Sequence, residues 1–147
     1  MDAVIAGRPL LAGNADAIAL VTREPLSFWG GYDQATGEII DRRHPLSGQN
    51  AAGRILVLPL SRGSSTTAAV LLEAVRQGTA PAAIVTDGLD PFLLLGAIVA
   101  EKMYAHTVPV VAVSHKDFER LSDGMRLTIR EDGRITIAPA NESGDNR

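Results

Sequence analysis

The chain has 147 residues, of which 46% are hydrophobic and 4% are aromatic, and its formal net charge at pH 7 is -3. A chain of this length can bury the core of one domain without a metal or a disulfide, and its 14 basic residues are too scattered for a nucleic-acid-binding face. The sequence contains no cysteine, which excludes disulfides and any iron–sulfur cluster held by thiolates of this chain.

No part of the sequence is expected to enter a membrane or a secretory route. The longest apolar runs, at residues 80–85 and 91–100, are too short to cross a bilayer. Residues 1–11 lack the basic start and the long apolar centre of a signal peptide. We therefore expect a cytoplasmic protein that has no membrane partner.

The first third of the chain is predicted to consist of strands and exposed loops. Ala3–Arg8 mixes apolar and small residues, and Ala17–Val21 is an apolar run, so we predict two short strands joined by a turn at residues 13–16. Pro25–Asp33 contains the only Trp and a pair of glycines, which favours a loop with close backbone approach. A short strand at Ile39-Ile40 then leads to an exposed loop over Asp41–Gly48.

Two features of these loops have more than one interpretation. Phe28 and Trp29 either cover the edge of the core or form a wall of a binding cleft, because aromatic side chains bury a large area in either place. His44 is either a general acid or base, or a solvated loop residue whose backbone is held extended by Pro45.

The middle and the end of the chain alternate strands with helices. Asp90 is expected to cap a helix that has Pro91 at its first position, and a hairpin is expected to turn at Asp132-Gly133. The other elements follow from apolar periodicity: strands at Arg54–Leu60, Ala82–Val85 and Val108–Val113, a helix from Ala68 that stops at Gly78, a helix over Phe92–Lys102, a helical turn over Lys116–Leu121, and hairpin strands at Leu127–Arg130 and Arg134–Ile137. This alternation indicates an α/β domain.

The stretch Ser61–Thr67 connects a predicted buried strand to a predicted helix and is rich in hydroxyl groups. At such a junction the first N–H groups of the helix have no internal partners, and they favour an anion. Arg62 could clamp a carboxylate or a phosphate, Gly63 lets a ligand approach closely, and Ser64 lies where the N–H groups converge. Simple helix capping would select the same hydroxyl groups, so the residues by themselves support both interpretations.

Four segments together resemble the small, swivelling-domain subunit of aconitase X. They are Pro25-Leu26-Ser27-Phe28-Trp29-Gly30-Gly31 followed by Asp33, then His44-Pro45-Leu46-Ser47-Gly48, Arg62-Gly63-Ser64-Ser65 and Ala80-Pro81-Ala82-Ala83-Ile84. The resemblance extends from about Gly7 to Ile137, and the combination is more specific than any single segment.

The resemblance implies a swivelling β/β/α domain over residues 1–138, with a mixed, barrel-like sheet and flanking helices, followed by a flexible polar tail at 139–147. It also implies a separate large subunit as partner, which would hold an iron–sulfur cluster or another metal. The active site would then form between the two subunits. Within this chain we expect no cofactor and no metal site.

The activity implied by the resemblance is that of a hydro-lyase, acting on cis-3-hydroxy-L-proline in some members and on mevalonate 5-phosphate in others. Ser64 would be the general base that takes the α-proton, with Ser65 as the nearest substitute, while the hydroxyl leaves from the metal of the large subunit. Substrate contacts would come from Arg62, Gly63 and Ser65 for the anionic group and from Phe28, Trp29 and Gly30 for the cleft. We expect cis-3-hydroxy-L-proline as the substrate; mevalonate 5-phosphate is the first alternative, and a non-catalytic module that binds an anion or a partner is the second.

Overall fold

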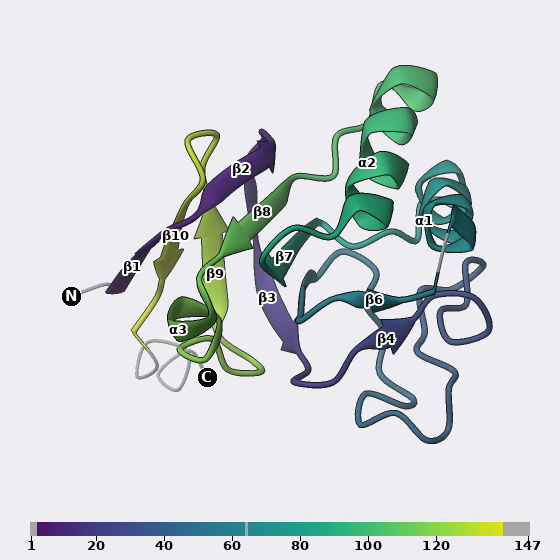
Figure 1. Cartoon of the computed structure of the whole chain (residues 1–147), viewed down its shortest axis with the longest axis horizontal. Coiled ribbons are helices and arrows are strands. Elements are labelled where there is room, and N and C mark those ends of the chain that lie inside the picture. The colour runs from purple at the N-terminus through teal and green to yellow at the C-terminus, as the bar shows by residue number, and fades with distance from the viewer. Residues whose placement is uncertain (1–2, 64, 140–147) are drawn as a thin grey trace, which may run out of the picture.

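Parallel strands form the centre of the fold (Figure 1). The computed structural model describes residues 3–63 and 65–139. In this part of the chain β3 (Ala15–Val21), β5 (Ile55–Leu58), β7 (Ala83–Asp87) and β8 (Val110–Val113) lie side by side in that order and point the same way. Their carboxyl ends therefore meet at one edge, which is where ligand sites of parallel sheets are usually found.

The continuous apolar run of β5 is explained by a core on each face of the sheet. Ile55 and Val57 pack into one core with the antiparallel strands, while Leu56 and Leu58 pack into the other core beneath the helices. All four side chains are buried. Because neighbouring side chains of a strand point to opposite faces, a strand covered on both sides has no polar alternation.

Antiparallel strands continue the sheet on both sides. β9 (Arg126–Ile129) pairs with β3, β10 (Arg134–Ile137) with β9, β1 (Ala3–Ala6) with β10, and β2 (Arg8–Leu11) with β8. The sheet order is β1-β10-β9-β3-β5-β7-β8-β2, so its two edge strands are consecutive in the chain. Since they are joined only by one residue, the sheet curls until it nearly closes. The predicted α/β class with a mixed, barrel-like sheet is confirmed.

Gly7 joins these two edge strands and corrects the prediction of a single strand over Ala3–Arg8. Its N–H donates to the carbonyl of Gly133 at 3.1 Å. A Cβ at this position would lie 2.4 Å from Cγ1 of Val111 and 2.7 Å from the Gly133 carbonyl oxygen. Only glycine allows the chain to pass from one edge of the sheet to the other here.

Two main helices cover one face of the central strands (Figure 1). α1 (Ser65–Gln77) buries a stripe at helical spacing: Thr67, Val70, Leu71, Ala74 and Val75. α2 (Pro91–Tyr104) packs against it so closely that a Cβ on Gly96 would lie 3.0 Å from Cα of Ala68. A short α3 (His115–Phe118) contributes Phe118 to the other core.

A few elements differ from the predictions. The expected strand at residues 39–40 is reduced to isolated pairings of Tyr32 with Ile39 and of Glu38 with Asn50. In its place, β4 (Leu26–Ser27) and β6 (Ser61–Arg62) form a small parallel ribbon. Of the predicted polar tail, residues 140–147 lie outside the described part of the chain.

Candidate functional site

The junction between β6 and α1 is shorter than the predicted loop Ser61–Thr67. Ser61 and Arg62 are strand residues, and helix α1 begins at Ser65. Between them only Gly63 is described, because Ser64 lies outside the described residues. The junction therefore brings an arginine within three residues of a long helix's N-terminus, which favours an anion.

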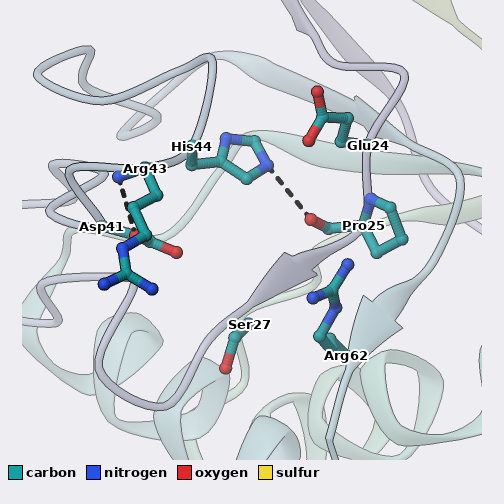
Figure 2. Close-up of a pocket in the computed structure, with 7 residues that line it drawn as sticks. All are labelled: Glu24, Pro25, Ser27, Asp41, Arg43, His44 and Arg62. Atoms are coloured by element: carbon teal, nitrogen blue, oxygen red, sulfur yellow. Dashed lines mark hydrogen bonds between the residues drawn. The ribbon is translucent and has the colours of Figure 1, made fainter.

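An open pocket of about 450 Å³ adjoins β4 and β6 (Figure 2). It is lined by Glu24, Pro25, Ser27, Asp41, Arg43, His44 and Arg62. Ser27 and Arg62 are paired residues of the ribbon, whereas the other wall comes from residues 41–44. The structure thus places Arg62, a predicted substrate ligand, in a pocket, but Gly63, Ser65, Trp29 and Gly30 are not part of its lining.

The pocket carries charges of both signs. Among the described residues, neither arginine of the pocket, Arg43 or Arg62, lies within ion-pair distance of a carboxylate. Likewise, within these residues the carboxylates of Glu24 and Asp41 have no basic side chain within ion-pair distance, although Asp41 Oδ1 accepts the backbone N–H of Arg43 at 3.0 Å. Unpaired charges of opposite sign in one small pocket suit a ligand that itself carries both.

His44 is buried and structural rather than solvated, which corrects the prediction of an exposed loop side chain. The N–H of Leu46 donates to Nδ1 at 3.1 Å, and Nε2 lies 3.1 Å from the Pro25 carbonyl oxygen (Figure 2). A carbonyl can only accept, so Nε2 carries the proton and the ring is neutral. His44 therefore fastens the pocket wall to the segment that leads into β4.

The N-terminus of α1 exposes Gly63 and Ser65. Gly63 has φ 128°, which favours glycine, and a Cβ there would be 3.6 Å from Oγ1 of Thr67. That hydroxyl is buried, and it has no hydrogen-bond partner within residues 3–63 and 65–139. Spare hydrogen-bonding capacity therefore exists directly beside Gly63.

The carboxylate of Asp90 connects the β6–α1 junction to the start of α2 through hydrogen bonds. Asp90 Oδ2 accepts the N–H of Ser61 at 2.5 Å and its hydroxyl at 2.7 Å, and Oδ1 accepts the N–H groups of Phe92 and Leu93. The predicted capping of α2 by Asp90, with Pro91 next, is confirmed. Its second set of hydrogen bonds, to a residue 29 positions earlier, had no signal in the sequence.

The aromatic segment separates into a core residue and an exposed one. Phe28 is fully buried and stacks on Tyr32 with ring centroids 5.1 Å apart, which corrects the prediction that it lines a cleft. Trp29 is 71% exposed, and its neighbour Gly30 has φ 78° and open space around it. Of the predicted cleft-lining set, only Trp29 and Gly30 are accessible in this chain.

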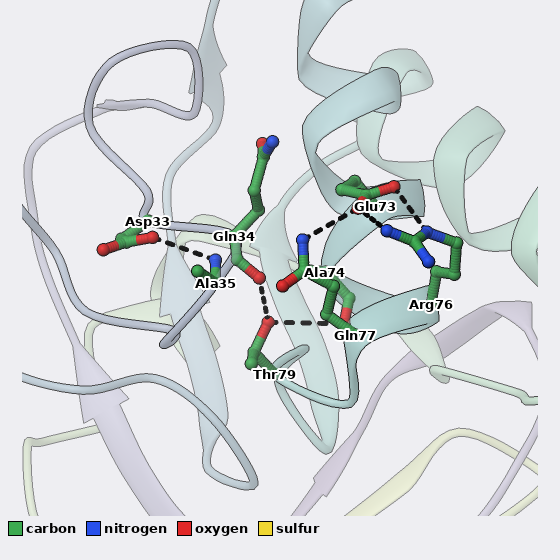
Figure 3. A network of polar contacts seen from close by, with 8 residues as sticks. All are labelled: Asp33, Gln34, Ala35, Glu73, Ala74, Arg76, Gln77 and Thr79. Carbon is green, nitrogen blue, oxygen red and sulfur yellow. Dashed lines mark hydrogen bonds and ion pairs between the residues drawn. The ribbon is translucent and has the colours of Figure 1, made fainter.

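Polar contacts fasten the segment after Trp29 to the far end of α1 (Figure 3). The Thr79 hydroxyl donates to the Gln34 carbonyl at 2.6 Å, and the Tyr32 hydroxyl donates to the Thr79 carbonyl at 2.8 Å. Burial raises the pKa of the Tyr32 phenol, so it remains a donor. Nearby, hydrogen bonds from Arg76 lower the pKa of Glu73 to about 2. The two hydrogen bonds of Thr79 therefore attach the segment after Trp29 to the residues that follow α1.

Other classes of site receive no support from the described residues. Within them no group of three His, Cys, Asp or Glu side chains could hold a metal ion. No helix among residues 3–63 and 65–139 is long and apolar enough to cross a bilayer.

Several residues of the site were missed by the sequence analysis. Glu24, Ser27, Asp41 and Arg43 contribute to the pocket with Arg62. The sequence offered one signal for these residues, the run of charged residues before His44. Nothing in the sequence indicated that this run would line the same pocket as Glu24.

Comparison with known proteins gives a consistent result. The chain is 43% identical over 136 residues to a cis-3-hydroxy-L-proline dehydratase of Pseudomonas aeruginosa, covering 88% of this chain but only 23% of that protein. It is 37% identical over 123 residues to the phosphomevalonate dehydratase small subunit of Methanopyrus kandleri, covering 83% of this chain and 87% of that subunit.

A solved structure and a family model agree with these relatives. The crystal structure of Thermococcus kodakaraensis aconitase X in its holo-form superposes with a TM-score of 0.83 and 32% identity, covering 93% of this chain and 99% of that one. The family model described as "Aconitase X swivel domain" matches residues 4–137. The chain therefore belongs to the aconitase X swivel domain family.

Proposed function

We propose that this chain is the small subunit of a two-chain hydro-lyase that removes water from cis-3-hydroxy-L-proline. The observation that carries the proposal is Arg62, which faces an open pocket beside the N-terminus of α1 and pairs with no carboxylate among the described residues. A guanidinium placed in this way is suited to hold the carboxylate of a small substrate.

The charges of the pocket support an amino-acid substrate. A cyclic amino acid carries a carboxylate, which the guanidinium groups of Arg62 and Arg43 can attract, and an ammonium group, which the carboxylates of Glu24 and Asp41 can attract. A phosphorylated hydroxy acid has two anionic groups and no cation, so the pocket carboxylates would repel it. The 43% identity to a cis-3-hydroxy-L-proline dehydratase points the same way.

In the proposed reaction Ser64 takes the proton from the α-carbon of the substrate. The electron pair of that C–H bond forms the C=C bond and the C3–O bond breaks. The leaving hydroxide takes a proton from solvent to become water, and Ser64 returns the abstracted proton to solvent, so one water is lost overall. Serine is a weak base, so its oxyanion must be stabilised, and the N–H groups at the start of α1 together with Arg62 are the groups in this chain suited to that task.

The remaining components are assigned to a partner. The chain matches only 23% of the Pseudomonas aeruginosa relative, which supports a larger partner that would supply the rest of such an enzyme. Three exposed apolar side chains lie near the junction: Trp29, Leu60 and Leu89. Leu60 and Leu89 directly precede Ser61 and Asp90, so they flank the hydrogen bonds that hold the junction. We assign this surface to contact with the large subunit, and to that subunit we also assign the iron–sulfur cluster or other metal.

A second function is supported by relatives that are themselves small subunits. Small subunits of phosphomevalonate dehydratase match this chain over most of their own length, 87% for Methanopyrus kandleri and 92% for Methanosarcina mazei. The alternative substrate is therefore mevalonate 5-phosphate, bound at the same junction.

The test uses the chain purified together with its large subunit. Each substrate is added separately, and loss of one water is followed by mass spectrometry. We expect turnover of cis-3-hydroxy-L-proline, and turnover of mevalonate 5-phosphate alone would contradict the substrate assignment. Ser64→Ala should lower kcat by a factor of about 100 or more while the subunits still copurify, whereas the matched control Ser122→Ala, at an exposed serine outside the junction, should retain most activity. Near-normal activity of Ser64→Ala would reject the serine as base.

A further inference from the structure

We infer that Asp90 is a positioning residue of the catalytic junction, and that its carboxylate sets the place of β6 relative to helix α2. The inference rests on the proposed function and adds a residue that does not touch the substrate. The Asp90 carboxylate is only 4% exposed and lies at the carboxyl end of β7, while β6 follows the carboxyl end of the neighbouring strand β5.

The hydrogen bonds of this carboxylate divide into two sets. Oδ1 accepts the N–H groups of Phe92 at 3.1 Å and Leu93 at 3.0 Å, which is an ordinary helix cap. Oδ2 accepts the N–H and the hydroxyl of Ser61, at 2.5 Å and 2.7 Å. Ser61 is also buried, so these bonds are shielded from water. The residue that follows is Arg62.

Capping alone does not require a carboxylate at this position. Helix α3 is capped by Ser114, whose hydroxyl accepts a single N–H, from Asp117 at 3.1 Å. A serine at position 90 could cap α2 in the same way, but its short side chain would not also reach Ser61. The second oxygen of Asp90 therefore serves the junction rather than the helix.

Loss of the two hydrogen bonds between Ser61 and Asp90 Oδ2 should affect catalysis more than folding. Without it, the buried N–H of Ser61 has no acceptor, and β6 keeps only its short pairing with β4. Movement of Arg62 and Gly63 by a fraction of an ångström would misplace the substrate carboxylate. Misplacements of about 1 Å cost on the order of 100-fold in rate.

Two variants separate the roles. Asp90→Ser keeps a cap for α2 and removes both bonds to Ser61. Asp90→Asn keeps the cap through its amide oxygen and turns an N–H donor toward the N–H of Ser61. The matched control is Ser114→Ala, which removes a cap on α3, a helix outside the proposed machinery.

The variants are measured in the two-chain enzyme by kcat, KM and thermal midpoint. We expect Asp90→Ser and Asp90→Asn to lower kcat by a factor of about 10 to 100, and Ser114→Ala to lower the thermal midpoint with kcat unchanged. Hydrogen exchange at the Ser61 amide, followed by mass spectrometry of the complex, should accelerate in both Asp90 variants, and it requires no turnover.

The outcomes distinguish this inference from the proposed function. If the wild-type enzyme dehydrates neither substrate, the proposed function is wrong. If hydrogen exchange at the Ser61 amide is then also unchanged in both Asp90 variants, the positioning role of Asp90 is wrong as well. If the wild type is active and kcat of Asp90→Ser and Asp90→Asn stays within threefold of it, Asp90 is only a helix cap and the inference is wrong.

Discussion

The neighbouring glycines Gly30 and Gly31, in the segment that presents Trp29, provide a sharp test of the structure. A Cβ on Gly31 would lie 2.1 Å from the carbonyl oxygen of Ser27, whereas a Cβ on Gly30 would meet nothing within 4 Å. We therefore expect Gly31→Ala to destabilise the protein far more than Gly30→Ala. Both replacements add the same methyl group, but only at Gly31 does that methyl group meet backbone atoms.

The size of each effect follows from the geometry. Real Cβ atoms essentially never come within 3.0 Å of another atom, so the Gly31 backbone and Ser27 must separate by about 1 Å. The N–H groups of Gly31 and Tyr32, which both donate to the Phe28 carbonyl, would be strained. Because the obstacle is backbone, we expect a loss of about 3 kcal/mol, the upper end for overpacking. Gly30 has φ 78°, so Gly30→Ala should cost about 1 kcal/mol.

Urea unfolding followed by far-UV circular dichroism measures both values on the same chain. At this chain length the expected losses correspond to thermal midpoints lowered by about 10 °C for Gly31→Ala and about 3 °C for Gly30→Ala. Equal losses for the two variants, or a larger loss for Gly30→Ala, would show that the turn between Ser27 and Tyr32 is not built as described.

Three further predictions concern charged and titratable groups. Arg62→Gln should raise KM by a factor of about 10 or more, because the substrate loses a charge-assisted hydrogen bond. The exposed control Arg42→Gln should leave KM unchanged, and equal effects of the two variants on KM would contradict the role of Arg62. A hydrogen bond to Asp87 raises the pKa of His115 above its usual 6.5, so its stabilising contribution is complete below that pH and is lost as pH rises through the folded value. Asp87→Asn should therefore lower the thermal midpoint more at pH 6 than at pH 9, and a pH-independent difference would refute this. Nitrogen NMR should find the His44 proton on Nε2 at pH 7, and a proton on Nδ1 would be incompatible with the hydrogen bond from the backbone.

The sequence determined those features whose signals are local. The apolar run Arg54–Leu60 predicted a strand covered on both faces, because only burial on two sides removes polar alternation. Asp90 followed by Pro91 predicted the start of α2, and Asp132-Gly133 predicted the hairpin turn, since capping and turn geometry depend on a few adjacent residues.

Only the tertiary structure decided which distant residues meet. The split of Ala3–Arg8 at Gly7 depends on Val111 and Gly133, which come close only when the sheet curls. His44 contacts the carbonyl of Pro25 because the long irregular segment between them folds back on itself. The sequence around each residue predicted only a loop.

The same division applies to the candidate site. Ser61–Thr67 was identified as a strand-to-helix junction from its own residues, and the aconitase X resemblance was carried by short motifs within the chain. The pocket brings together charged side chains from distant segments, and the hydrogen bonds that Ser61 donates to Asp90 join segments that follow the neighbouring strands β5 and β7 of the sheet. Periodicity and capping act over a few residues, whereas strand order is decided by how all the apolar faces pack at once.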